Sequence, residues 1–165
     1  MDITDLVLND HQRQRQAFAI LDDIAPTDTE RLAAVWGDLA SFLEVHAAAE
    51  EEVLYPHVLT HSDPEAQETK DAIGDHNKIR DAIAAAAKAE VGSTAWWDAV
   101  GEARSENTEH MGEEEDDVLG PFRRQAPLEL RAELGLAFEA AKTARFSPQL
   151  DEGDKDPQEY VDANS

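Results

Sequence analysis

The stretch HAAAEEEVLYP at residues 46–56 places an imidazole and a carboxylate four residues apart, shortly before a proline. Residues at i and i+4 are neighbours on one face of an α-helix, so His46 and Glu50 can offer a nitrogen and an oxygen to the same small volume. A partial echo, HMGEEEDDVLGP, follows at residues 110–121. Two such pairs predict a binuclear metal site between helices.

The composition limits both the ligands and the partners of such a site. The chain has 165 residues, no cysteine, and 37 Asp and Glu against 14 Lys and Arg, which gives a net charge of −23. This length suits one domain with a sizeable core, and metal ligands must come from His, Asp, Glu or Tyr. The negative charge disfavours nucleic acids and anionic membranes as partners.

The N-terminal sequence and the hydropathy pattern predict a location. Residues 1–5 lack the basic start and apolar run of a secretion signal, and no stretch approaches the roughly 18 apolar residues of a membrane span. We therefore predict a soluble cytoplasmic protein.

Helical periodicity with caps and breakers divides the chain into five predicted helices. They occupy about residues 5–25, 27–60, 63–91, 94–120 and 127–144. A capping box at Thr27 opens the second, Pro56 is expected to kink or unsettle its last turn, and Trp97 is expected to face inward on the fourth. The last helix is expected to pack on the others through its leucines and a phenylalanine, which are Leu128, Leu130, Leu134, Leu136 and Phe138.

Four long helices with short links predict an all-α fold, an antiparallel up-down-up-down four-helix bundle. Residues 1–146 form this domain together with the C-terminal helix, and residues 147–165 are predicted to be a disordered acidic tail. At a rise of about 1.5 Å per residue, one histidine of each long helix falls at a common level, within about one turn. These histidines are His11, His46, His76 and His110.

A single inward histidine is more often a hydrogen-bonded core residue than a metal ligand. Four imidazoles that converge with Glu50 and Glu114 cannot be explained as a single core histidine can. Buried carboxylates and imidazoles gathered in one place need a compensating positive charge. Two divalent cations would satisfy all six. Imidazole and carboxylate ligands without thiolate suit iron or manganese, with zinc possible, and bundle cores are a setting for carboxylate-bridged di-iron sites. Iron is the favoured metal.

The order of these residues carries a family resemblance. His11, His46-x-x-x-Glu50, His76 and His110-x-x-x-Glu114, with the Glu-Glu-x-Val-Leu-Tyr-Pro ending of the first motif, resemble the hemerythrin-like (HHE, cation-binding) domain over about residues 1–125. The resemblance implies a four-helix bundle that holds two iron ions joined by an oxo or hydroxo bridge. It also implies that the four histidines are terminal ligands and that Glu50 and Glu114 bridge.

One departure from the family concerns Arg80. The oxygen-carrying members have a second histidine four residues after the one on the third helix, and here that position is Arg80. The missing nitrogen leaves a coordination position open, which favours action on a substrate over reversible oxygen carriage. A cation near the metals is costly unless it turns toward the acidic surface, or toward a carboxylate such as Glu50 or Glu114.

Two assignments stay open at this point. Tyr55 either closes the site as a phenolate ligand, with a catalytic role, or packs with its hydroxyl on a backbone partner. Glu115 competes with Glu114, which is preferred because it repeats the spacing of Glu50. Other acidic residues near the motifs, such as Glu51, are expected to form a solvated face.

These observations favour a di-iron protein that acts on H₂O₂, O₂ or NO. The favoured function is catalase-like decomposition of peroxide in oxidative stress defence. The alternative is binding, storage or sensing of O₂, NO or iron without turnover, and a further one is a metal-free helical interaction module.

Overall fold

The structure is a computed structural model, which describes residues 1–146, and all of its regular elements there are helical. In chain order they are α1 (Ile3–Asp23), α2 (Thr29–Ala49), η1 (Glu50–Leu54), α3 (Tyr55–His61), α4 (Gln67–Lys88), α5 (Thr94–Glu113), η2 (Glu114–Leu119), α6 (Gly120–Gln125) and α7 (Leu128–Phe146). The all-α class is therefore confirmed, and the predicted acidic tail lies outside the described residues. None of the described helices is long and apolar enough to cross a membrane.

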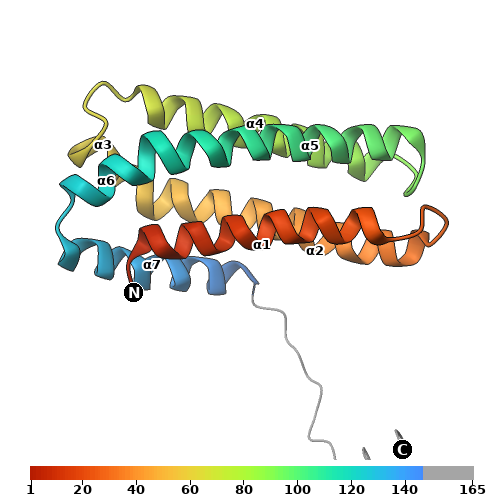
Figure 1. Ribbon diagram of the computed structural model, residues 1–165, viewed down its shortest axis with the longest axis horizontal. Helices are drawn as coiled ribbons and strands as arrows, with labels where there is room; N and C mark the ends of the chain where they lie inside the picture. The colour runs from red at the N-terminus through yellow and green to blue at the C-terminus, as the bar shows by residue number, and fades with distance from the viewer. Residues whose placement is uncertain (147–165) are drawn as a thin grey trace, which may run out of the picture.

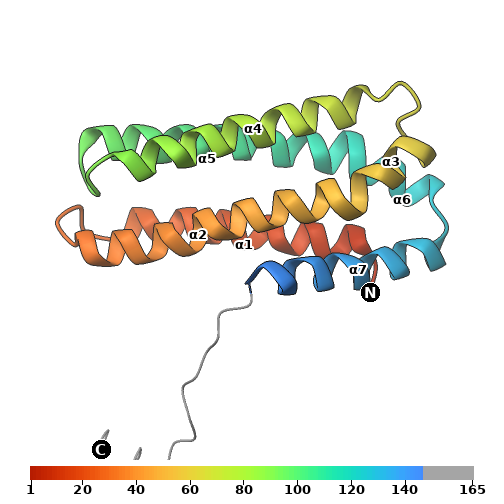
Figure 2. The same cartoon turned by 180° about the vertical axis from the view of Figure 1, so that it is seen from behind.

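The long helices form a bundle of two pairs. Helix α1 lies beside α2 and α4 lies beside α5, and the short turn within each pair is at the same end of the molecule (Figure 1). The view from behind shows α3 and α6 at the opposite end (Figure 2). Helix α7 lies against α1, α2 and η1, so it covers one pair and leaves the other uncovered.

The helix starts follow from capping side chains, with two differences from the predicted positions. Asp28, and not Thr27, caps α2 by accepting from the Arg31 amide at 3.2 Å. Helix α4 begins at Gln67, later than predicted, because Asp63 accepts from the Gln67 and Thr69 amides at 3.0 and 2.9 Å from a turn outside the helix. Ala66 closes that turn in the left-handed conformation, with φ of 58°.

A π-helical segment begins at the glutamate of each His-x-x-x-Glu pair, and the one before Pro56 is the unsettled turn that was expected there. In η1 the Tyr55 amide donates to the Glu50 carbonyl, five residues back. Proline supplies no amide hydrogen and crowds the carbonyl four residues earlier, and the wider π turn relieves both problems. Pro56 then falls in the first turn of α3, where no amide hydrogen is needed, and the helix continues to His61.

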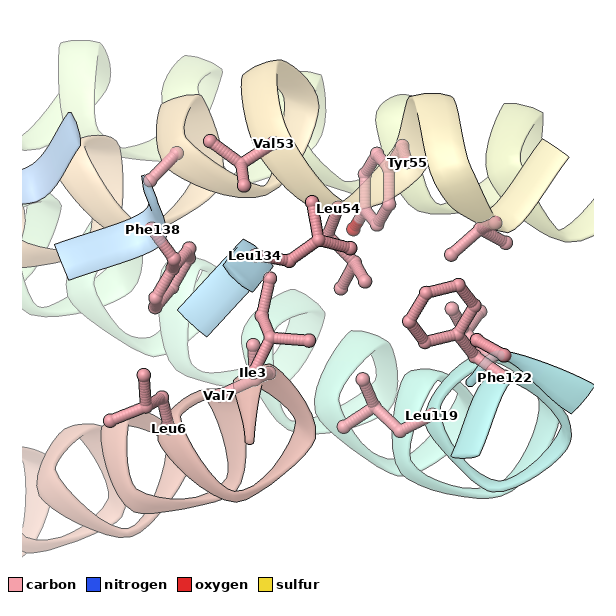
Figure 3. Close-up of a cluster of buried hydrophobic side chains, with 14 of the residues drawn as sticks. Ile3, Leu6, Val7, Val53, Leu54, Tyr55, Leu119, Phe122, Leu134 and Phe138 are labelled. Atoms are coloured by element: carbon pink, nitrogen blue, oxygen red, sulfur yellow. The ribbon is translucent and has the colours of Figure 1, made fainter. Parts of the chain in front are cut away.

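The apolar core consists of two clusters with a polar layer between them. The first gathers side chains from α1, η1, η2, α6 and α7, as Figure 3 shows, including Ile3, Leu54, Phe122 and Phe138. The second lies toward the α1–α2 and α4–α5 turns and contains Trp96, which is 1% exposed, whereas the predicted Trp97 is only half-buried. The polar layer holds the predicted site.

Helix α7 packs through a narrower face than predicted. Leu134 and Phe138 are buried, whereas Leu128 and Leu136 are 59% and 72% exposed, because they lie on the opposite face of the helix. Gly135 allows the close contact with α1, since a Cβ there would collide with the Met1 carbonyl oxygen.

Candidate metal centre

Each of the four long helices contributes one histidine to the polar layer, and the structure brings all six predicted metal ligands together. The histidines are at most 3% exposed, and Glu50 and Glu114 are 0% and 1% exposed. Both His-x-x-x-Glu pairs cross from the last turn of an α-helix into a π segment. The i to i+4 spacing therefore delivers the nitrogen and oxygen pairs that the sequence predicted.

Two overlapping groups within this cluster have the geometry of metal sites. One consists of His11, His46, Glu50 and Glu114, and the other of Glu50, His76 and His110, with the ligand atoms of each group within 4.8 Å of one another. Glu50 belongs to both, because its Oε1 lies 2.9 Å from His46 Nε2 and its Oε2 lies 3.4 Å from His76 Nε2.

The distances from Glu114 to the histidines explain why it belongs to the group of His11, His46 and Glu50. Glu114 Oε2 lies 3.2 Å from His11 Nε2 and 4.0 Å from His110 Nε2. His76 Nε2 and His110 Nε2 face each other at 3.1 Å. Glu115 points elsewhere, so Glu114 is the carboxylate of this segment that enters the cluster.

Among the described residues, five buried atoms at the centre of the cluster face one another at ion-pair distances but make no hydrogen bond of acceptable geometry. They are His11 Nε2, His46 Nε2, both carboxylate oxygens of Glu50 and Glu114 Oε2. Buried polar groups are nearly always satisfied, and unpartnered ones that converge on one point are explained by a bound cation. The donor set therefore fits metal ions.

Three of the histidines are held from behind by carboxylates. Glu115 Oε1 lies 2.9 Å from His11 Nδ1, Asp10 Oδ2 lies 3.1 Å from His46 Nδ1, and Glu51 Oε1 lies 2.8 Å from His76 Nδ1. A carboxylate that accepts from the outer nitrogen directs the lone pair of the other nitrogen inward and makes it more basic. Glu51, which was expected on a solvated face and not among the ligands, is part-exposed and also supports His76 from behind.

Each of these carboxylates is paired in turn with a cationic side chain. Arg15 contacts Glu115 at 2.8 Å, Lys142 contacts Asp10 at 2.6 Å and Arg80 contacts Glu51 at 2.9 Å. The sequence analysis did not identify this outer layer. The sequence does hold one indication of this outer layer, because each supporting carboxylate is directly next to a predicted ligand in the chain.

Arg80 turns away from the cluster. Its guanidinium donates to Glu51 Oε1 and to Asn77 Oδ1, and the side chain is one-third exposed. Of the two expected directions, the structure shows the one toward the acidic surface, and neither Glu50 nor Glu114 receives the guanidinium.

Tyr55 follows η1 and reaches the cluster. Its hydroxyl donates to Glu114 Oε1 at 3.0 Å and lies 3.5 Å from His76 Nε2, and its ring stacks on that imidazole. Burial, with Glu114 and Glu50 nearby, raises the pKa of Tyr55 well above its usual value. The Tyr55 hydroxyl therefore bonds to a carboxylate and not to the backbone, and ligation of a metal by its oxygen stays a prediction.

The charges of the cluster stabilise one another. Burial favours the neutral form of Glu50, but His46 and His76 outweigh it and hold the pKa of Glu50 well below its usual range. Burial also lowers the pKa of His46, but Glu50 and Asp10 together raise it to about 10. His110 lacks an equivalent pair of carboxylates, and burial lowers its pKa.

Comparisons with known proteins agree with this geometry. A family model described as the hemerythrin HHE cation binding domain matches residues 2–121, which include all six clustered residues. A protein of Nostoc sp. (strain PCC 7120 / SAG 25.82 / UTEX 2576) described as a DNA nickase is 26% identical over 144 residues, 87% of this chain. The chain spans only 40% of the length of that relative. No solved structure matches the chain.

Proposed function

Because this chain belongs to the hemerythrin HHE cation-binding domain family, we propose that its clustered side chains hold two iron ions that act on a small ligand. The observation that carries the proposal is the set of five buried, unpartnered nitrogen and oxygen atoms at the centre of the cluster. In a metal-free interaction module these atoms would have only one another, as buried ion pairs without hydrogen bonds, to offset the cost of their burial.

The overlap of the two groups supports two ions. Glu50 belongs to both groups, so its two oxygens suit a carboxylate shared between ions, with Glu114 completing the first group. Nitrogen and oxygen donors without thiolate suit iron. Bound iron would supply redox chemistry by cycling between ferrous and ferric states.

A cavity next to the cluster limits the size of the ligand. It offers about 10 Å³ to the centre of a water-sized molecule, and its lining includes Leu43, Ile79 and Ile83 together with His46, His76 and His110. That is room for about one water molecule. The space therefore suits a molecule of very few atoms, such as peroxide, O₂ or NO.

Peroxide decomposition is the favoured reaction, in which two molecules of hydrogen peroxide give two of water and one of dioxygen. Protons must be moved in this reaction, and the hydroxyl of Tyr55 is held 3.0 Å from Glu114 Oε1 and 3.5 Å from His76 Nε2. We assign Tyr55 the role of a proton donor that acts at the cluster. The alternative, ligand binding without turnover, needs no such donor.

The experiment measures iron content, the visible spectrum and oxygen release from peroxide, in wild type and Tyr55→Phe. We expect close to two irons per chain in both proteins and absorption from an oxo-bridged iron pair after oxidation. Oxygen release should fall at least about tenfold in the variant, since a positioned proton donor contributes that much or more. Trp97→Phe, a change to a half-buried aromatic ring in the second apolar cluster, is the matched control.

Two results would contradict the proposal in different ways. Stoichiometric zinc, with no iron bound after anaerobic reconstitution, would refute the iron centre. If wild type and Tyr55→Phe each held two irons but released oxygen no faster than the iron-free protein, the iron centre would stand. That result would favour ligand binding without turnover.

The name of the Nostoc relative refers to DNA, but three-fifths of that protein has no counterpart in this chain. The net charge of −23 opposes contact with a polyanion. The absence of a nucleic-acid partner and the cytoplasmic location stay predictions.

A further inference from the structure

A second hollow reaches the cluster from the face formed by α4, α5 and η2. Its outer wall carries Glu68, Asp71, Asp75 and Glu113, and its base is formed by His110 and Glu114 together with the apolar side chains of Ala72 and Val118. We name this hollow the acidic funnel. Its lining residues come from α4, α5 and η2. Figure 2 shows α7 on the side of α1 and α2, away from α4 and α5.

The rim of the acidic funnel concentrates negative charge. Within residues 1–146, Asp75 is paired with Lys78 at 2.8 Å, but no cationic side chain lies within ion-pair distance of Glu68, Asp71 or Glu113. The pKa of Glu68 is raised, by burial and then by the neighbouring carboxylates. Like charges held this close repel one another, and a cation between them would relieve that repulsion.

The base of the funnel supplies an independent indication of a ligand. Glu114 is 1% exposed, and its Oε2 has no hydrogen-bond partner. The funnel therefore connects a surface carboxylate cluster with an unsatisfied buried oxygen of the candidate centre.

We propose that the acidic funnel is the entry site at which divalent cations lose water and from which they load the centre. Glu68, Asp71 and Glu113 would attract the ion and replace part of its water shell, and Glu114 and His110 would receive it. The apolar cavity beside His46 and His76 has few such oxygens, so the uncharged ligand would enter by a different opening. This inference rests on the proposed metal centre.

The test measures how fast Co²⁺ binds to the full-length metal-free protein, followed by its visible absorption in a stopped-flow instrument. The funnel variant combines Glu68→Gln, Asp71→Asn and Glu113→Gln. The control variant combines Glu30→Gln, Asp98→Asn and Glu102→Gln, which are exposed acids without ion-pair partners in the described chain, toward the α1–α2 and α4–α5 turns. Both variants lose the same charge.

We expect the funnel variant to bind Co²⁺ at least about tenfold more slowly than the control variant, because a focused field raises association rates by that factor or more. The final number of ions per chain should be unchanged. The wild-type rate should also fall more steeply with ionic strength than the rate of the funnel variant.

Two other results would overturn the proposed entry site. Equal rates in the two triple variants, with normal final stoichiometry, would overturn the funnel and leave the metal centre standing. Failure of the wild type to bind any Co²⁺, Fe²⁺ or Zn²⁺ would overturn both. Circular dichroism of the variants, and the single change Glu113→Gln, guard against a folding defect.

Discussion

Residues 46–61 and 110–125 have the same local structure but different surroundings. Each begins with a His-x-x-x-Glu pair at the end of an α-helix, passes through a π segment and enters a short helix with a proline in its first turn. The shared backbone follows from shared local chemistry, because both prolines withhold the same amide hydrogen.

The histidines differ in what other helices supply to them. His46 contacts Asp10 of α1, which Lys142 of α7 holds at 2.6 Å, so three elements fix this imidazole. His110 faces His76 and lines the acidic funnel. One copy of the motif is thus braced by α7, and the other lines the acidic funnel.

The glutamates of the two motif copies, Glu50 and Glu114, also differ in their partners. Both oxygens of Glu50 are unpartnered and belong to both metal groups, whereas Glu114 accepts from Tyr55 and belongs to one. Identical spacing in sequence therefore does not give identical roles. Partners from distant parts of the chain assign them.

The largest expected effect separates Glu50 from Glu114. Glu50→Ala should remove both irons, because each group loses an oxygen ligand, whereas Glu114→Ala should leave close to one iron per chain in the group of His76 and His110. The measurement is metal analysis after anaerobic reconstitution and desalting.

Glu52→Ala is the control for these two variants, since Glu52 is an exposed neighbour that pairs with Arg145. It should retain two irons. Equal iron loss in Glu50→Ala and Glu114→Ala would show that the two carboxylates are equivalent bridges, as the family resemblance implies, and would remove the asymmetry.

A smaller effect tests the brace at His46. Lys142→Met keeps most of the side-chain volume but leaves Asp10 without its cation, and we expect a loss of about 2 kcal/mol in the free energy of unfolding. Urea denaturation of chelator-treated protein measures it, since bound metal would add its own stabilisation. Lys88→Met, an exposed control, should stay within about 0.5 kcal/mol of wild type. A Lys142→Met protein as stable as this control would show that α7 does not brace His46.

The sequence predicted what depends on helical spacing and short-range chemistry. The long helices, the common level of the four histidines and the two i to i+4 pairs all follow from a regular rise and turn. The outer carboxylates Asp10, Glu51 and Glu115 could not be found that way, because a carboxylate beside a ligand faces solvent or an imidazole according to how neighbouring helices are rotated.

The same reason explains the error in α7. Leucines on two faces of α7 gave no basis for choosing Leu134 over Leu136, and the close approach of Met1 to Gly135 depends on residues far apart in the sequence. Near Pro56 an unsettled turn was expected, but its π form leaves no composition signal of its own.

The smallest expected effect concerns the exit from the first motif copy, where the turn into α4 puts Ala66 at φ of 58°. An L side chain in this left-handed region costs about 1 to 2 kcal/mol, and glycine avoids most of that but makes the unfolded chain more flexible. Ala66→Gly should therefore stabilise the protein by about 0.5 to 1 kcal/mol in urea denaturation. Ala85→Gly, in the exposed interior of α4, should instead destabilise it by about 1 kcal/mol. If both changes destabilised the protein equally, the turn at residues 62–66 would not hold the left-handed conformation, and the two motif copies would differ less in how they end.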